Sequence, residues 1–538
     1  MQRLVARLVL LSAVAAIPAG VLAAPLACRP NSNPACHPGF PVEFSGPGIP
    51  ADVGFVQFSS PVVARLGVVG DSLQDIIVGT TGGYVIAYHA NGTFLWARRT
   101  GGVAIQSKPA VADIDGDGRL EVVVTAGSPS GNGGGMYVLR RDGSLKCSHE
   151  LPATTQGFYG SPAVGRLDRT RPTQMQIVVG GFDHSIRAFH ADCSEWWKKG
   201  VADDVIDTVW SSAALFDLDR DGQLDVIIGQ DSGQGTLPNG MQVGGQLRAF
   251  RGNGVGELPG FPKKLQDVIY SSPAIGDIPG YGRPAIATGY GHCWDMPGCA
   301  PHGNWHVVTD EAVYAWSASG APLPGWPYAT PGEASRTNSP ALADLDGDGT
   351  LETIIGTLDK ATSPAVDEFG NVHVIRSNGT PFPGWPQKTW IARTCSTNVQ
   401  WLDFAASPIV ADITGDGIPE IIAVAADYVM VWDRNGNQLH RIAPDVCAGS
   451  PNPAHFQMQA WSAIHSTPTV ADLYGDGRIS LVVGSRSTSG LGALYVWTFA
   501  GTSATLANLP WPEFRHDARN TGVHRGEVIF RNGFQTSG

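Results

Sequence analysis

The stretch "SKPAVADIDGDGRLEVVV", residues 107–124, decides the fold class. A short apolar run precedes an acid-rich turn, which extends from Asp113 to Glu121, and a second apolar run of valines follows. Two apolar runs joined by a turn that contains glycine are typical of a β-hairpin. The stretch therefore predicts two antiparallel strands with four carboxylates in the turn between them.

The same pattern begins eight times along the chain. The starts lie at residues 59–66, 107–114, 160–167, 211–218, 271–278, 338–345, 406–413 and 466–473, at steps of 48 to 68 residues. Each is followed by a second and a third apolar run and often by an Asn-Gly or Asp-Gly turn into a fourth. Four short strands per repeat predict an all-β fold, a β-propeller with four-stranded blades. Eight blades are expected. Seven remain an alternative if the first repeat only completes the last blade, and a solenoid of stacked hairpins is the other architecture that the repeats allow.

The composition agrees with a strand-rich extracellular protein. The chain has 538 residues, with 68 glycines, 39 prolines and 43% apolar residues, which suffices for a large core with many turns. The net charge of −12 argues against nucleic acid as a partner and suits a protein that holds divalent cations.

The first 23 residues have the pattern of a signal peptide. Arg3 and Arg7 precede an apolar run, and the small-residue motif that ends at Ala23 places a cleavage site before Ala24. A membrane anchor is the alternative, but the apolar run is short and Pro18 interrupts it. We expect a secreted, periplasmic or cell-surface protein with no membrane insertion after cleavage. Its expected regions are a signal peptide (1–23), a lead-in segment (24–56), the propeller (57–525) and a C-terminal tail (526–538).

All eight cysteines lie outside the signal peptide, and an even number in an exported chain indicates disulfides. Proximity in the sequence favours the pairs 28–36, 147–193, 293–299 and 395–447, among the 105 possible connectivities. Zinc binding is the competing interpretation. It is disfavoured because the cysteines are scattered and no Cys-x-x-Cys motif occurs.

The repeats resemble the FG-GAP/VCBS repeats of integrin-α-like propellers, which are common in bacterial secreted proteins. Residues 107–124 and the stretch "NSPALADLDGDGTLETIIG" (338–356) carry the resemblance most clearly. It extends over residues 57–525 and includes "PWPEFRHDARNTG" (510–522), which is similar to the closing segment of such proteins. The resemblance implies the propeller fold, but not an activity, because such propellers serve adhesion, scaffolding and some enzymes.

The resemblance also implies calcium in the acidic turns. Aspartates two residues apart along a tight loop repel one another, and a hard cation that accepts six to eight oxygens at about 2.3–2.6 Å removes the conflict. The pattern D-x-D-x-D-G-x-x-(D/E) differs from an EF-hand in its spacing and in the strands that flank it. The implied ligands in three complete loops are Asp113, Asp115, Asp117 and Glu121 with the Arg119 carbonyl; Asp217, Asp219, Asp221 and Asp225 with the Gln223 carbonyl; and Asp344, Asp346, Asp348 and Glu352 with the Thr350 carbonyl.

Two further loops are incomplete. In the fourth, Asp412, Asp416 and Glu420 remain and Thr414 replaces an aspartate, so a fourth calcium site is expected. The fifth keeps Asp472 and Asp476 but has Tyr474 and Ser480 at acidic positions, which favours an empty turn. For every loop the alternative is an unliganded polar turn. We expect the calcium ions to stabilise the fold rather than to take part in a reaction.

Strand alternation predicts a second functional face. Long insertions follow the second strands and link the blades, so they should lie on the face opposite the calcium loops. The candidate ligand-binding residues there are His292, Trp294, His302, Trp305, His306, Trp401 and Trp461. The expected function is adhesion or recognition of an extracellular glycan or protein. The alternative is a polysaccharide lyase or hydrolase with its site in these loops, although no GxSxG, HExxH or Walker motif occurs and no residue is assigned a catalytic role.

Overall fold

The computed structural model describes most of the chain. The described residues are 34–67, 73–231, 244–291, 311–331, 333–335, 338–359, 370–392, 399–401, 406–440, 456–487, 489–505 and 507–524. Nearly all regular structure in them is β. The helical element among them is a single 3₁₀ turn, η2 (Val201–Asp203). None of the helices in this part of the chain is long and apolar enough to cross a membrane.

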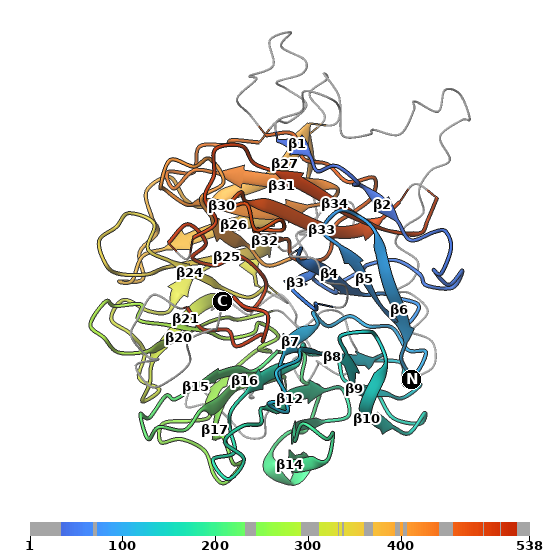
Figure 1. The fold of residues 1–538 in the computed structure, drawn as a ribbon. Coiled ribbons are helices and arrows are strands. Elements are labelled where there is room, and N and C mark those ends of the chain that lie inside the picture. The colour runs from blue at the N-terminus through green and yellow to red at the C-terminus, as the bar shows by residue number, and fades with distance from the viewer. Residues whose placement is uncertain are drawn as a thin grey trace.

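The strands form eight antiparallel sheets that follow one another around a ring (Figure 1). Blade 1 contains β3 (Val62–Ala64), β4 (Asp75–Gly79), β5 (Tyr84–His89) and β6 (Phe94–Arg99). Blade 2 contains β7 (Ala110–Ala112), β8 (Glu121–Gly127), β9 (Gly134–Arg140) and β10 (Leu145–Leu151). Blade 3 contains β11 (Ala163–Gly165), β12 (Gln176–Gly181), β13 (Ser185–Phe189) and β14 (Glu195–Lys199). Blade 4 contains β15 (Ala214–Phe216), β16 (Asp225–Asp231), β17 (Gly245–Arg251) and β18 (Lys263–Leu265).

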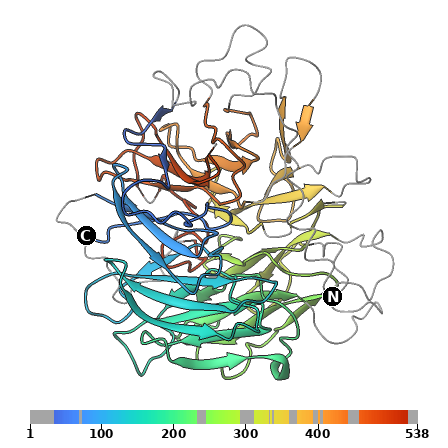
Figure 2. The same cartoon turned by 90° about the vertical axis from the view of Figure 1, so that its right-hand side faces the viewer.

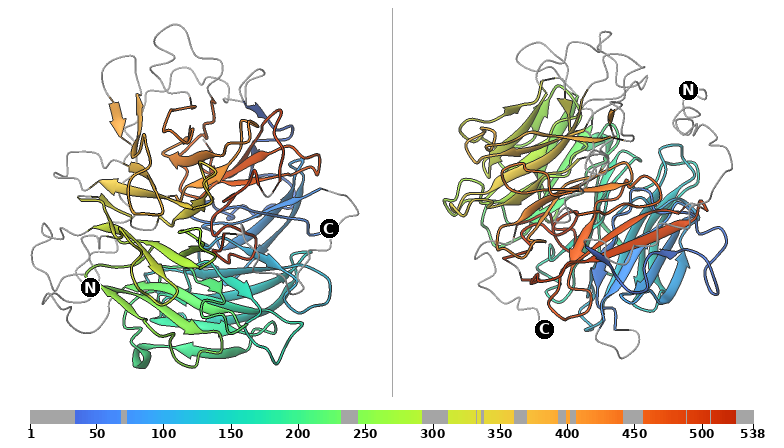
Figure 3. Two further views of the ribbon diagram at one scale, coloured as in Figure 1. Left: turned by 90° about the vertical axis from the view of Figure 1, so that its left-hand side faces the viewer. Right: turned by 90° about the horizontal axis from the view of Figure 1, so that it is seen from above.

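The other half of the ring is less regular (Figures 2 and 3). Blade 5 contains β19 (Ala274–Gly276), β20 (Ala285–Gly289), β21 (Ala312–Ser317) and β22 (Tyr328–Ala329). Blade 6 contains β24 (Ala341–Ala343), β25 (Glu352–Asp359), β26 (Gly370–Ile375) and β27 (Gln387–Ala392), with the short additions β23 (Glu333–Ala334) and β28 (Val399–Trp401). Blade 7 contains β29 (Ile409–Ala411), β30 (Glu420–Ala425) and β31 (Tyr428–Trp432). Blade 8 contains β32 (Thr469–Ala471), β33 (Ser480–Arg486) and β34 (Gly492–Thr498).

The N-terminal segment completes the last blade. The strands β1 (Ala35–Cys36) and β2 (Val42–Glu43) both pair antiparallel with β34. The first repeat has its own four strands, so it forms a blade rather than the missing strand of another one. The expectation of eight blades is therefore confirmed, and closure by strands from both ends of the chain removes the open sheet edges.

Burial follows the position of each strand in its blade. Every residue of β8 is buried, whereas β10, the outer strand of the same blade, is half-buried or exposed. Inner strands lie between neighbouring blades, where apolar side chains from adjacent sheets pack together. One such core joins Ile77 and Val85 of blade 1 to Val122 and Val124 of blade 2. This packing between blades accounts for the continuous apolar runs of the second strands.

The Ser/Thr-Pro start of each repeat joins neighbouring blades. The hydroxyl group before the proline, or before Ala213 in blade 4, accepts a hydrogen bond from the backbone N–H at the same position of the preceding blade, as Ser272 Oγ does from Ser212 N at 2.9 Å. The acceptors are Ser60, Ser161, Ser212, Ser272, Ser339, Ser407 and Thr467. These bonds run around the axis and show that the first strands surround it. Lys108 takes the hydroxyl position in blade 2.

The tail residues 511–524 cross the centre of the ring, where Figure 1 shows the red end of the chain. Backbone N–H groups of six inner strands donate to tail carbonyls at 2.7 to 3.0 Å: those of Val111, Val164, Leu215, Ile275, Val410 and Val470. The buried Arg515 guanidinium donates to the carbonyls of Pro273 at 2.6 Å and Ala213 at 2.8 Å. The Nζ atom of Lys108, also buried, donates to Asn520 Oδ1 at 2.8 Å. The tail therefore closes the axis on the side of the acidic loops.

Tryptophans just before outer strands contact the next blade. The indole N–H of Trp326 donates to the Ser377 carbonyl at 2.9 Å, and that of Trp385 to the Arg434 carbonyl at 2.8 Å. Both belong to Pro-Gly-Trp-Pro motifs. Gly384 lies so close to the turn of the next blade that a Cβ atom on it would be 1.9 Å from the Asn435 oxygen, which explains the glycine in this motif.

One predicted disulfide lies within the described residues and is confirmed. Cys147 of β10 is bonded to Cys193, which lies in the turn before β14, so the bond links blades 2 and 3. The other three pairs include cysteines outside the described residues, and they remain predictions.

Candidate functional site

The acidic turns connect the first and second strands of their blades. In the first turn, Asp113 Oδ1 accepts hydrogen bonds from the backbone N–H groups of Gly116 at 2.8 Å and Asp117 at 3.0 Å. Asp113 Oδ2 accepts a third from Gly118 at 2.9 Å. Gly116 and Gly118 both have positive φ, near 80°, which few other residues adopt. The first aspartate therefore folds the turn, and the glycines allow it.

The last acid of each pattern begins the second strand and is buried. Glu352 Oε2 accepts the backbone N–H of Leu345 at 2.9 Å, and Glu420 Oε2 accepts that of Ile413 at 2.8 Å. Burial, together with repulsion by neighbouring aspartates, raises the pKa of Glu352 and of Glu420 to about 8. The same causes raise the pKa of Asp225 to about 7. The fold therefore holds these buried carboxyl groups close to other acids, where their negative charges repel one another.

The structure brings together most of the predicted metal ligands. Four groups have ligand oxygens within 4.8 Å of one another: Asp113, Asp115 and Glu121; Asp217, Asp219 and Asp225; Asp344, Asp346 and Asp348; and Asp412, Asp416 and Glu420. Asp117, Asp221 and Glu352 belong to the same turns but lie outside these groups. The carbonyls of Arg119, Gln223 and Thr350 are in the same turns, as is Thr414, which stands in place of an aspartate, and their role as ligands stays a prediction.

These groups could each hold a metal ion. Their donors are all oxygen, which suits hard divalent cations, and the spacing of the oxygens matches an ion at about 2.3–2.6 Å from each. In the second group, the buried Asp217 Oδ1 has no hydrogen-bond partner among the described residues. A buried carboxylate oxygen without a donor is a candidate for ligation by a cation.

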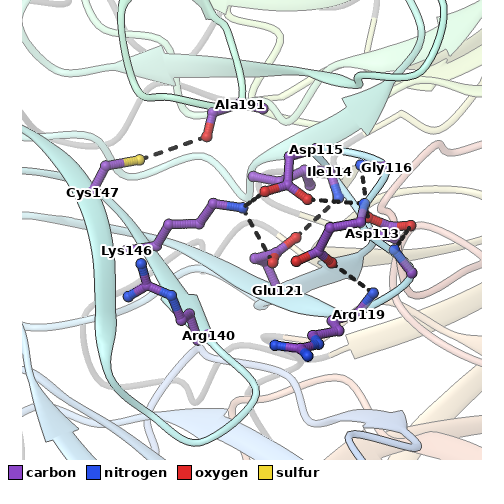
Figure 4. A network of polar contacts seen from close by, with 12 residues as sticks. Asp113, Ile114, Asp115, Gly116, Arg119, Glu121, Arg140, Lys146, Cys147 and Ala191 are labelled. Atoms are coloured by element: carbon purple, nitrogen blue, oxygen red, sulfur yellow. Dashed lines mark hydrogen bonds and ion pairs between the residues drawn. The ribbon is translucent and has the colours of Figure 1, made fainter.

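A lysine reaches into the first acidic loop (Figure 4). Lys146 of β10 forms an ion pair with Asp115, and its Nζ lies 3.2 Å from Glu121 Oε1. Burial lowers the pKa of Lys146, but its contacts with the two acids outweigh burial and raise the pKa overall. At the second loop, Arg251 Nη1 lies 3.0 Å from Asp219 Oδ2. The sequence pattern did not indicate either cation, because both come from other strands of the blade.

The fifth turn adopts the same hydrogen-bond pattern with fewer acids. Asp472 Oδ2 accepts the N–H of Gly477 at 2.9 Å, as Asp412 Oδ2 accepts that of Gly417 in the fourth turn. Ser480 stands where the other turns have a buried acid. The turn conformation thus requires the first aspartate and the glycines, and the additional acids serve another purpose.

Most of the predicted ligand-binding residues fall outside the described residues: His292, Trp294, His302, Trp305 and His306. Trp401 is in β28, and its side chain also lies outside the description. Trp461 is half-buried against the core of blade 8, and its backbone N–H donates to the Tyr495 hydroxyl at 3.1 Å. Its ring contacts Tyr495 edge-on at 5.7 Å between centroids, a packing role.

A row of aromatic rings lies at the mouth of the axis opposite the acidic loops. One position lies immediately before each repeat start, a few residues ahead of the first strand of the blade. Among the described residues it is occupied by Phe58, Gln106, Tyr159, Trp210, Tyr270 and His465. The side chains at these positions are all half-buried. We call Tyr159, Trp210 and Tyr270 the aromatic row: their successive ring centroids are 4.8 and 5.1 Å apart. Phe182, fully buried, packs beneath Trp210 and Tyr159 at 4.7 and 4.8 Å.

A polar chain fixes the middle ring of this row. The Trp210 indole N–H donates to Thr208 Oγ1 at 3.0 Å, and that hydroxyl donates to Asp231 Oδ2 at 2.6 Å. Asp231 ends β16 and is 5% exposed. Its other oxygen, Oδ1, has no hydrogen-bond partner of good geometry in the described part of the chain, although the Tyr270 hydroxyl lies near the carboxyl group. An aromatic residue directly before several repeat starts could have signalled this site, but the sequence does not show that these positions lie side by side.

Comparison with known proteins agrees with this description. Residues 68–124 match the model of the FG-GAP-like repeat family. The match covers one repeat of an eight-bladed ring whose hairpin turns carry acidic groups. Together these findings support the FG-GAP β-propeller family that the sequence resemblance implied. No curated protein matches this chain in sequence.

Two solved structures are similar to this chain. The V. cholerae biofilm matrix protein Bap1 has 13% identity and a TM-score of 0.53, with 87% of this chain and 92% of that chain covered. The rhamnogalacturonan lyase YesW has 14% identity and a TM-score of 0.47, with 86% and 74% covered. At such identities the likeness concerns the fold alone.

Proposed function

We propose that the protein is an exported, calcium-stabilised propeller that binds an extracellular glycan or protein on the face opposite its acidic loops. The observation that carries the proposal is the difference between the two ends of the axis. One end has the four acidic groups and the tail that closes the axis. The other has half-buried aromatic rings, and the described strands that flank 232–243 and 292–310 end there.

Calcium is the proposed ion because the donors are carboxylates in hairpin turns. The ion would be held by Asp344, Asp346 and Asp348 and by the corresponding acids of the other loops. Its positive charge would offset the repulsion between these neighbouring carboxylates. Extracellular calcium modules bind with Kd values on the order of 10⁻⁴–10⁻³ M and are still filled in calcium-rich surroundings. An ion that binds only the folded state stabilises it.

Export is proposed from the first 23 residues, whose charged start, apolar run and small-residue end resemble a signal peptide. The Cys147–Cys193 disulfide supports an oxidising location. Expression in a bacterial host with N-terminal sequencing of the exported protein tests this part. A mature chain that begins at Ala24 would support it, and an uncleaved chain retained with the cells would overturn it.

Calcium titration of chelator-treated protein tests the division of roles between the faces. The variant with Asp344→Asn and Asp346→Asn should lose one calcium site and some thermal stability, but should keep ligand binding. If the variant instead loses ligand binding and keeps its stability, calcium bridges to the ligand and the proposed division is wrong.

A polysaccharide-active enzyme remains the alternative, and one observation favours it. Burial, together with the charge of Asp207, raises the pKa of Asp231 to about 8, so this acid keeps its proton at neutral pH, as a general acid must. Release of reducing ends or unsaturated products from polysaccharides, abolished by Asp231→Asn, would establish the enzyme. Binding without products would establish the binding module.

A further inference from the structure

We propose that the aromatic row binds an uncharged oligosaccharide across the mouth of the axis, with Asp231 hydrogen-bonded to a sugar hydroxyl. This proposal rests on the proposed function, and it names the ligand class and the site. It stands on three observations: the contiguous rings, the buried carboxyl oxygen beside them, and the sign of the surrounding charges.

The rings form a continuous surface rather than a cage. Tyr159, Trp210 and Tyr270 are half-buried, so part of each ring is accessible. Their centroid separations of 4.8 and 5.1 Å mean that neighbouring rings touch and leave no room for a group between them. A cage for a methylated ammonium group needs rings on opposite sides of a gap. A row of adjacent rings suits a flat, extended ligand such as a short sugar chain, whose C–H faces pack on the negative ring faces.

The carboxyl group of Asp231 supplies the polar contact. Its Oδ2 accepts the Thr208 hydroxyl at 2.6 Å, and Thr208 also holds the Trp210 indole, so the acid and the ring are fixed relative to each other. Oδ1 is buried and makes no hydrogen bond of good geometry in the described part of the chain, and the Tyr270 hydroxyl, itself part of the row, lies near the carboxyl group. Binding sites for small ligands combine an apolar wall with a few such fixed polar groups. A hydroxyl of the ligand would satisfy this atom.

The charges around the row exclude an anionic sugar. The groups that act electrostatically on the Tyr270 hydroxyl are Asp231, Asp207 and Asp267. Together with burial they raise the pKa of Tyr270 far above its usual range. A uronic acid or a sulfated sugar would bring a further negative charge close to Asp207 and Asp267. A neutral sugar avoids this repulsion.

The site is supported from below by the fold. Hydrogen bonds to the hydroxyl groups of Ser161, Ser212 and Ser272 join blades 2 to 5 next to the row. Phe182 fills the space behind the rings. The tail closes the axis at the other end. The three rings therefore sit on a rigid base, which lowers the entropy lost on binding.

The test uses the whole mature protein in calcium. Soluble oligosaccharides of glucose, xylose, mannose and N-acetylglucosamine are titrated in a calorimeter, with oligogalacturonate as the charged comparison. We expect at least one neutral oligosaccharide to bind and oligogalacturonate not to bind. Trp210→Ala should then weaken binding by about tenfold or more.

Two further variants keep the test decisive. Asp231→Ala removes both the buried Oδ1 and the acceptor of the Thr208 hydroxyl, so it should weaken binding, and its melting temperature is measured to separate this loss from a loss of stability. Tyr281→Ala is the matched control, because Tyr281 is 82% exposed on the acidic-loop face, and it should leave the affinity unchanged. If neutral sugars bind equally to wild type and to folded Trp210→Ala, the site is wrong but the proposed function stands. If no neutral oligosaccharide binds, the inferred ligand class is wrong, and the proposed function then depends on a protein ligand.

Discussion

Lys146 Nζ lies 3.2 Å from Glu121 Oε1, inside the first of the four acidic groups. The lysine comes from the outer strand of the blade and supplies a positive charge at the position where a metal ion would be held. The third and fourth groups have no such contact among the described residues. The four groups are therefore not equivalent, although three of them have the same complete sequence pattern.

The first prediction concerns this lysine. Because its ammonium group competes with a divalent cation for the same oxygens, the first loop should bind calcium more weakly than the third. Lys146→Gln should add one calcium ion to the stoichiometry measured by calorimetry, or strengthen one site by about tenfold. Lys198→Gln, an exposed lysine on the neighbouring blade, is the control. Unchanged calcium binding in Lys146→Gln would show that the lysine does not occupy the metal position.

The second prediction concerns pH. The pKa of Asp231 is raised from 3.8 to about 8, chiefly by burial and then by the charge of Asp207. The native state therefore binds a proton that the unfolded state has released between pH 4 and 8. Over this range the acid makes the free energy of unfolding fall by up to about 1.4 kcal/mol per pH unit. Urea unfolding at pH 5 and 7.5 should show a smaller fall for Asp231→Asn than for wild type. An identical fall would mean that Asp231 is ionised in the native protein.

The third prediction concerns the bond between blades 2 and 3. The double variant Cys147→Ser with Cys193→Ser should lower the free energy of unfolding by about 3 kcal/mol, because the bond closes a loop with a sequence separation of 46. Chemical denaturation in calcium is the measurement. If the double variant and reduced wild type lose the same free energy of unfolding, the loss comes from the missing bond and not from the serine side chains. A double variant as stable as oxidised wild type would contradict it.

The fourth prediction concerns the tail at the axis. Arg515→Ala removes donors to two buried carbonyls, those of Ala213 and Pro273, and leaves a cavity. We expect it to destabilise the fold by about 3 kcal/mol. Arg519→Ala, on the same segment with a half-buried side chain, should cost less than about 1 kcal/mol. Equal effects of the two substitutions on the melting temperature would show that the tail is not anchored through Arg515.

The hairpins, the eight repeats and the acidic turns could be predicted from the sequence, because each depends on local patterns such as Asp113–Glu121. The closure of blade 8 by β1 and β2 could not, because the pairing joins residues more than four hundred positions apart. The positions of Lys146 and Arg251 were missed for the same reason: they lie in the third and outer strands, beyond the turn that carries the pattern.

The candidate binding face was predicted by strand alternation, but its aromatic row was not. Most of the predicted ligand-binding residues lie in the long insertions, such as 290–311, where tryptophan and histidine are frequent. Tyr159, Trp210 and Tyr270 each lie directly before a repeat start. Only the geometry of the rings shows that they lie side by side. The sequence alone does not show which equivalent positions meet at the axis.

Thermal melting of the mature chain in calcium, in magnesium and in chelator tests the central claim most directly. If the acidic loops are structural calcium sites, calcium should raise the melting temperature by on the order of 5 °C or more over chelator, and magnesium should do so much less. The variant with Asp344→Asn and Asp346→Asn should show a smaller rise. Equal melting temperatures in calcium and chelator would contradict the account, and the acidic turns would then be folded by their own hydrogen bonds alone.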